Sequence, residues 1–140
     1  MLKVKRISHV AVAVPSIDES AAKFLAALGL APSNRELVAS QKVEAAILPI
    51  GEAAIELIEP KGNEGVAKFL EKRGPGLHHI AVEVEGIEGA LEHLKANGVP
   101  LIDQAPRIGA HGHKVAFLHP KATGGVLIEL VEPVGGDHAH

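Results

Sequence analysis

Short stretches in which apolar and polar residues alternate recur along the chain and give the first sign of its organisation. The stretches SHVAVAVPSI (8–17) and HHIAVEVEGI (78–87) share His, Ala, Val, Val and Ile in register. Each leads into a segment with apolar residues at helical spacing that ends at a glycine, DESAAKFLAALGL and IEGALEHLKANGV. The sequence therefore predicts the same strand and helix twice.

Three extended segments follow each predicted helix. They are clear in VEAAILPI, AAIELIEP, KVAFLHP and GVLIELVEP, and weaker near 35–38 and 101–102. The join between the halves contains one short helix, at about 65–72, between Gly and Pro residues. Each half therefore reads β-α-β-β-β.

This pattern predicts an α+β fold in which two βαβββ half-modules pack side by side. A half of about 60 residues would have a marginal core on its own, so a single domain is expected. The predicted boundaries are 1–140 for the domain, about 5–60 and 76–133 for the half-modules, and 61–75 for the linker.

Composition narrows the possible functions. The chain has 140 residues, 46% of them apolar, and only three Phe, so its core must be aliphatic. The net charge is −3, there is no Trp or Tyr, and no basic cluster stands out, so nucleic-acid binding is not expected. No apolar stretch approaches the roughly 20 residues of a membrane span. Cysteine is absent, and a cytoplasmic protein is the simplest interpretation.

The last strands of the two halves carry nearly the same phrase, IELIEP (55–60) and IELVEP (128–133). Each places a carboxylate, Glu56 or Glu129, among aliphatic residues, where a lone charge is costly unless it is paired, protonated or bound to metal. His9 and His79 occupy equivalent strand positions beside small Ala residues. One such residue alone is more often structural, but four in matching phase predict a two-His, two-carboxylate site suited to Co, Ni, Mn, Fe or Zn.

With these features the sequence resembles the vicinal oxygen chelate superfamily over about residues 5–133. That superfamily pairs βαβββ modules around a metal-binding cleft, and its ligands lie on the first and last strands of each module. The resemblance implies that His9, Glu56, His79 and Glu129 are metal ligands. It also implies one divalent ion per chain, with Co²⁺ as the expected ion and Mn²⁺, Ni²⁺ or Zn²⁺ as alternatives.

Within the superfamily the sequence is most similar to the methylmalonyl-CoA epimerase family. The similarity lies in ISHVAVAVP (7–15), GLHHIAVEV (76–84), IGAHGHKVAFLHPK (108–121) and GGVLIELVEP (124–133). It implies interconversion of (2R)- and (2S)-methylmalonyl-CoA by proton transfer at the α-carbon, through an enolate stabilised by the metal.

The same resemblance assigns two acid–base residues, Glu44 in QKVEAAIL and Glu129. The counterpart of Glu44 in the second half is Lys114, so Glu44 breaks the symmetry of the repeat. Without the resemblance, Glu44 reads as an ordinary exposed strand residue. A CoA thioester would be the substrate, and a homodimer is typical of the family.

The loops after the second half's helix supply candidates for substrate binding. Lys121, His111 and Gly112 could face the CoA moiety, since a Lys and loop backbone amides can bind phosphate. A solvated loop shaped by turn chemistry is an equal alternative for these residues.

Two other functions fit the sequence. A glyoxalase I-type lactoylglutathione lyase would use the same four ligands, and some epimerases have Gln where this chain has Glu56. A non-catalytic small-molecule-binding relative would keep the fold but generally lacks the metal ligands. The metal site alone therefore does not separate the enzymes.

Overall fold

A computed structural model describes residues 2–134 and divides them into two compact units. The first unit contains residues 10–78, and the second contains residues 2–9 and 79–134. Whether the two units form one domain stays a prediction. Within residues 2–134, no helix combines the length and the apolar character that crossing a membrane requires.

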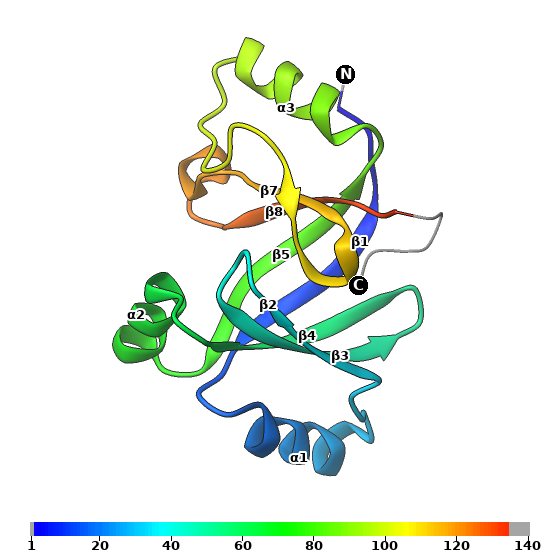
Figure 1. Ribbon diagram of the computed structural model, residues 1–140, viewed down its shortest axis with the longest axis vertical. Helices are drawn as coiled ribbons and strands as arrows, with labels where there is room; N and C mark the ends of the chain where they lie inside the picture. The colour runs from blue at the N-terminus through cyan, green and yellow to red at the C-terminus, as the bar shows by residue number, and fades with distance from the viewer. Residues whose placement is uncertain (1, 135–140) are drawn as a thin grey trace. The chain divides into compact units, whose positions relative to one another are not determined.

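The first unit contains four strands and two helices (Figure 1). Its strands are arranged in the order β2-β3-β4-β1, with β1 parallel to β4 and the other pairs antiparallel. The elements are β1 (Val4–Ala13, of which the part from Val10 belongs here), α1 (Ile17–Leu28), β2 (Asn34–Val38), β3 (Val43–Ile50), β4 (Ala53–Pro60) and α2 (Glu64–Arg73).

The second unit repeats this plan with the start of β1 added, in the order β1-β5-β8-β7-β6. Strands β5 and β8 are parallel, while β7 is antiparallel to both β8 and β6. The elements are β5 (Gly76–Val84), α3 (Ile87–Ala96), β6 (Arg107–Ile108), β7 (Lys114–Phe117) and β8 (Ile128–Glu132). Two short 3-10 turns, Ala110–Gly112 and Pro120–Thr123, flank β7.

The predicted β-α-β-β-β order is confirmed in both halves, and α2 is the helix predicted in the linker. One prediction needs correction. The segment at 101–102 is not a strand, because Leu101 makes only an isolated bridge to Leu118. The corresponding strand is β6, which has only two residues and therefore no alternation that a sequence pattern could reveal.

In each half, the aliphatic face of the first strand packs on a helix, as the alternation predicts. Val14, directly after β1, lies in a buried cluster of the first unit, against which Val12 of β1 and Phe24 of α1 pack. Val84 of β5 lies in the equivalent cluster with Leu91 of α3. The opposite face of each first strand, which carries the histidine, is thereby turned away from the helix.

Strand register is the same in the two halves. Ala11 of β1 pairs with Glu56 of β4, and Ala81 of β5 pairs with Glu129 of β8. In each case the alanine lies two residues after the histidine of the same strand, so histidine and alanine share a face. The repeat seen in the sequence is therefore a repeat of strand pairing as well.

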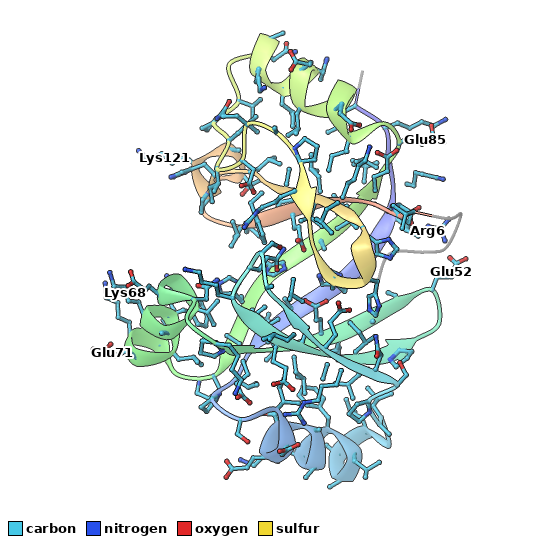
Figure 2. The ribbon with its side chains drawn as sticks, viewed as in Figure 1. Arg6, Glu52, Lys68, Glu71, Glu85 and Lys121 are labelled. Carbon is cyan, nitrogen blue, oxygen red and sulfur yellow. The ribbon has the colours of Figure 1, made fainter. Side chains whose placement is uncertain are left out.

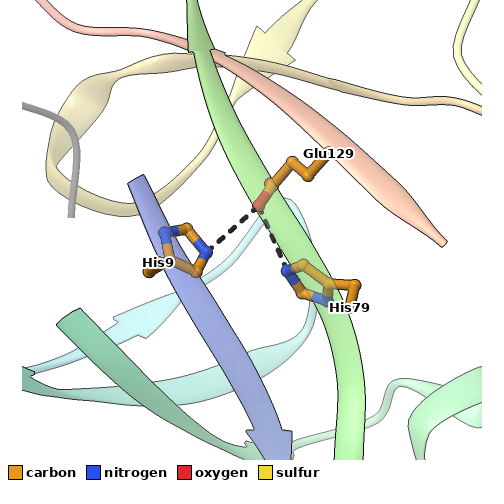
Figure 3. Close-up of side chains that lie close together, drawn as sticks. All are labelled: His9, His79 and Glu129. Carbon is orange, nitrogen blue, oxygen red and sulfur yellow. Dashed lines mark hydrogen bonds and ion pairs between the residues drawn. The ribbon is translucent and has the colours of Figure 1, made fainter. Parts of the chain in front are cut away.

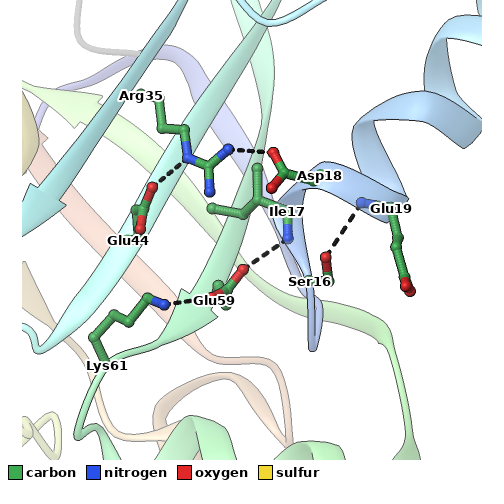
Figure 4. A network of polar contacts seen from close by, with 8 residues as sticks. All are labelled: Ser16, Ile17, Asp18, Glu19, Arg35, Glu44, Glu59 and Lys61. Carbon is green, nitrogen blue, oxygen red and sulfur yellow. Dashed lines mark hydrogen bonds and ion pairs between the residues drawn. The ribbon is translucent and has the colours of Figure 1, made fainter.

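The second glutamate of each repeated phrase has a structural role that the sequence did not reveal. Glu59 Oε1 accepts a hydrogen bond from the N–H of Ile17, the first residue of α1, at 2.8 Å (Figure 4). Glu132 does the same for α3, accepting from the N–H groups of Gly86 and Ile87 at 3.1 and 3.2 Å. Each glutamate pairs with otherwise orphaned amides and with the positive end of the helix dipole.

We expect Glu59→Gln to lower the free energy of unfolding at pH 7 by about 0.5–1 kcal/mol. The pKa of the Glu59 carboxyl lies below its ordinary value, because hydrogen bonds from Lys61 and from the N–H of Ile17 outweigh the opposing effect of burial. A depressed pKa adds stability above the unfolded-state value of about 4.3, and this contribution is lost as the pH falls through the folded-state pKa. Denaturant unfolding should show the deficit at pH 7 and its disappearance in acid, while Glu71→Gln, at an exposed position of α2, should show neither.

Candidate metal centre

Three buried side chains from three strands meet in the second unit (Figure 3). His9 comes from β1, His79 from β5 and Glu129 from β8. Glu129 Oε1 lies 3.3 Å from His9 Nε2 and 3.2 Å from His79 Nε2. The three ligand-type atoms all lie within 4.8 Å of one another, and each residue is 6% exposed or less.

The strand pairing explains why these residues meet. Parallel β5 and β8 place Ala81 beside Glu129, and His79 follows on the same face one alternation away. Ala81 has no exposed surface, and its small side chain leaves the face open for the imidazole and the carboxylate. The large aliphatic residues of the same strands fill the helix side instead.

Neighbouring groups orient both imidazole rings. Ser8 Oγ lies 3.1 Å from His9 Nδ1, so this ring nitrogen has a hydrogen-bond partner and Nε2 is directed to Glu129. The rings of His79 and Phe117 pack edge to face, with their centroids 5.0 Å apart. The rings of His9 and His79 are themselves 5.7 Å apart at 71°.

Phe117 is in turn held by Asp103. The N–H of Phe117 donates to Asp103 Oδ2 at 2.8 Å, and Arg107 Nε lies 3.4 Å from Asp103 Oδ1. The Arg107 guanidinium also lies 5.9 Å from the centroid of the Phe117 ring. The His79 ring is thus backed by a side chain that is fixed through both its backbone and its ring.

Opposing influences act on the Glu129 carboxyl. Burial raises its pKa, but hydrogen bonds with His79 and then His9 lower it by more, so the pKa lies well below its ordinary value. Glu129 is therefore a carboxylate at neutral pH, which is the form that binds a cation.

The three residues fit a divalent metal ion. With metal–ligand distances of about 2.0–2.2 Å, adjacent donors lie roughly 2.8–3.1 Å apart in octahedral geometry and roughly 3.3–3.6 Å apart in tetrahedral geometry. The two His–Glu donor distances of 3.3 and 3.2 Å lie between the octahedral and tetrahedral spacings, at the separation that ligands of one ion adopt. Two imidazole nitrogens and one carboxylate oxygen suit Co²⁺, Ni²⁺, Mn²⁺, Fe²⁺ or Zn²⁺.

The fourth predicted ligand, Glu56, lies in the first unit. It is 6% exposed and occupies the middle of β4, between two aliphatic neighbours on the strand. Its pairing with Ala11 matches the pairing of Glu129 with Ala81. Metal ligation by Glu56 stays a prediction.

The structure does not bring Glu44 to the face that carries Glu56. Glu44 pairs directly with Glu59, so these two glutamates share a face, and Glu59 lies three residues from Glu56 on the opposite face of β4. Side-chain contacts agree, since Arg35 binds both Glu44 and Asp18 of α1 (Figure 4). The catalytic role of Glu44 stays a prediction, and this position argues against it.

Strand register shows whether Glu44 and Lys114 occupy equivalent positions in the two halves. Lys114 pairs with Glu132 in the second unit, as Glu44 pairs with Glu59 in the first. The two positions are therefore structurally equivalent, as the sequence repeat indicated. In both halves the residue lies on the helix side, and Lys114 Nζ accordingly pairs with Glu88 of α3 at 2.7 Å.

The three predicted substrate-binding residues are all exposed in the second unit. Lys121 lies in the 3-10 turn after β7 and extends away from the ribbon (Figure 2), while its N–H donates to His119 Nδ1. His111 and Gly112 follow each other with positive φ angles of 59° and 73°. Contact of these residues with a substrate stays a prediction.

Two buried polar residues of the second unit were missed by sequence reasoning. Glu83 is 3% exposed, and its Oε2 lies 3.3 Å from Arg6 Nε and 3.8 Å from Lys5 Nζ. His113, just before β7, is 6% exposed and accepts a hydrogen bond from the N–H of Val134. The alternation of residues along β5 puts Glu83 on the same face as His79, and this pattern could have identified Glu83 from the sequence.

Comparison with known proteins identifies the class to which this fold and site belong. The family model of the Glyoxalase/Bleomycin resistance protein/Dioxygenase superfamily matches residues 8–117. The chain belongs to this superfamily, which confirms the resemblance inferred from the strand repeats and the predicted fold class.

Its relatives include named epimerases. The ethylmalonyl-CoA/methylmalonyl-CoA epimerase of Cereibacter sphaeroides is 38% identical, with 91% of this chain and 97% of the relative covered. The human mitochondrial methylmalonyl-CoA epimerase is 39% identical, with 89% and 72% covered. A structure of a methylmalonyl-CoA epimerase in complex with methylmalonyl-CoA and NH4+ has a TM-score of 0.91 at 31% identity, covering 97% of this chain and 99% of that one.

Proposed function

We propose that this protein is a metal-dependent epimerase that interconverts (2R)- and (2S)-methylmalonyl-CoA. The observation that carries the proposal is the buried cluster of His9, His79 and Glu129, in a chain similar over nearly its whole length to methylmalonyl-CoA epimerases. The cluster has the donor atoms of a catalytic metal site, and the relatives supply the substrate class.

Removal of the α-proton requires catalysis, because the α C–H of a thioester is a very weak acid. A bound divalent ion would act as a Lewis acid toward the thioester and carboxylate oxygens of the substrate. His9, His79 and Glu129 would hold that ion, with Glu56 as a fourth ligand and Co²⁺ as the expected metal. The case for Glu56 is its burial and the register that β4 shares with β8.

Inversion at the α-carbon needs an acid–base group on each side of the substrate. Glu129 is one, because it is ionised and lies among the ligands. The second would come from the first half, where the sequence assigned Glu44. CoA contacts with Lys121, His111 and Gly112, and a homodimeric assembly, complete the proposal.

Hydrogen–deuterium exchange at C2 tests the function directly. Each epimer of methylmalonyl-CoA is incubated in D2O with the untagged, Co²⁺-loaded protein, and deuterium at C2 is followed by mass spectrometry. We expect incorporation from both epimers at a rate that falls to background after chelation. No exchange at full metal loading would rule out the epimerase.

A parallel assay separates the alternatives left by the metal site. A glyoxalase I-type lyase would convert the glutathione hemithioacetal of methylglyoxal into a thioester, which is followed by its ultraviolet absorbance. A non-catalytic relative would do neither reaction. We expect exchange with methylmalonyl-CoA and no turnover of the hemithioacetal.

A further inference from the structure

We infer that Glu36, rather than Glu44, is the acid–base residue contributed by the first half of the chain. The inference rests on the proposed epimerase function and assigns a catalytic group to it. The structure of the first unit carries it, through strand register, side-chain contacts and the chemistry of one sheet face.

Register places Glu36 on the same sheet face as Glu56. Glu36 of β2 pairs with Ala45 of β3, and Ala45 pairs with Ile58 of β4. Directly paired residues share a face, and alternate residues of a strand share a face. Because Ile58 and Glu56 are two residues apart on β4, Glu36 and the predicted ligand Glu56 project from one surface.

The neighbours of Glu36 on β2 confirm this orientation independently. Arg35 projects to the helix side, where it binds Glu44 and Asp18 of α1. Glu36 must therefore project to the other side, because successive residues of a strand alternate. The contacts that occupy Glu44 thus fix the orientation of Glu36 as well.

The face that carries Glu36 has few other candidates for proton transfer. On this face β3 contributes only apolar residues between the two carboxylates, with Ala45 and Ile47 both buried. In the described strands β2 to β4, Glu36 and Glu56 are its only acidic residues. Strand spacing of roughly 4.8 Å and a rise of roughly 3.3 Å per residue put their Cα atoms about 12 Å apart.

Epimerisation transfers two protons, one from C2 to Glu36 and one from Glu129 to C2. The Glu36 carboxylate takes the proton from C2, and the C–H electron pair moves into the C=C bond of a thioester enolate. Glu129, which has first taken a proton from water, then donates it to the opposite face of C2, the C=C pair forms the new C–H bond, and Glu129 returns to its carboxylate form. The other epimer uses the two groups in the reverse order, and exchange of the carboxyl protons with D2O introduces deuterium.

The test compares Glu36→Gln with Glu44→Gln, the same isosteric change on two neighbouring strands. Each variant is loaded with Co²⁺, its visible absorption spectrum is used to verify occupancy, and deuterium exchange is measured from each epimer separately. Exposed Glu71→Gln on α2 controls for loss of a carboxylate (Figure 2). Epimerisation by Glu36→Gln should fall by roughly 10²–10⁴-fold.

The pattern between epimers distinguishes catalysis from a structural effect. Without Glu36, one epimer should lose exchange, while the other still exchanges through Glu129 with retention of configuration. Equal losses from both epimers, or no loss, would overturn the inference, as would the one-epimer pattern in Glu44→Gln. Absence of exchange in the wild-type protein would instead refute the epimerase function, and the inference with it.

Discussion

Glu129→Gln is expected to lose epimerisation by roughly 10²–10⁴-fold even when its metal site is saturated. Glutamine keeps an oxygen that can coordinate, so weaker metal binding can be overcome with excess Co²⁺. It cannot take a proton at neutral pH, so the acid–base contribution is lost at any metal concentration. The measurement is epimerisation rate against Co²⁺, with occupancy followed by the visible absorption of the bound ion.

Glu56→Gln is the matched control, because the repeat places the two residues at equivalent positions of β4 and β8. If Glu56 only ligates, its variant should recover most of its rate at saturating Co²⁺. Glu129→Gln should also affect the epimer opposite to the one affected by Glu36→Gln. Full recovery of Glu129→Gln at saturation would show that this carboxylate holds the metal without moving a proton.

The sequence predicted the parts of the structure that alternation and repetition encode. The equivalence of the halves, the strands carrying His9 and His79 and the positions of Glu56 and Glu129 all follow from period-two patterns that occur twice. Such patterns can be recognised without knowledge of tertiary contacts, because they depend only on which side chains share a face.

The second glutamates of the repeated phrases show where this reasoning stopped short. Glu59 and Glu132 lie three residues after Glu56 and Glu129, so alternation already put them on the opposite face of the strand. Their partners, the first amides of α1 and α3, could not be deduced, because the position of a helix over a sheet depends on packing. Each repeated hexapeptide therefore places one glutamate on each face of its strand.

Glu44 illustrates a different limit. Its catalytic assignment came from resemblance to a family, and a resemblance carries residues over without testing the face on which they lie. The face depends on the register between β3 and β4, which the two-residue turn at Gly51 and Glu52 sets. A one-residue difference in that turn would reverse every side chain of β3 relative to Glu56.

Chelation is expected to abolish deuterium exchange and to lower the melting temperature. An ion that binds only the folded state at 100 times its Kd adds about 2.7 kcal/mol of stability. For a chain of this size that corresponds to a shift of about 5–10 °C. Thermal unfolding of the chelated protein, followed by titration with Co²⁺, should show a saturable rise that parallels the return of exchange.

The His79→Ala variant locates the effect at the site, because it removes a predicted metal ligand whose ring lies against Phe117 and contacts Glu129. We expect it to show little rise in melting temperature with Co²⁺ and no return of exchange. His93→Ala, the same change at an exposed position of α3, should respond like the wild-type protein. An undiminished rise in His79→Ala would mean that the stabilising ion binds elsewhere in the chain. A rise without recovered exchange in the wild-type protein would separate metal binding from catalysis.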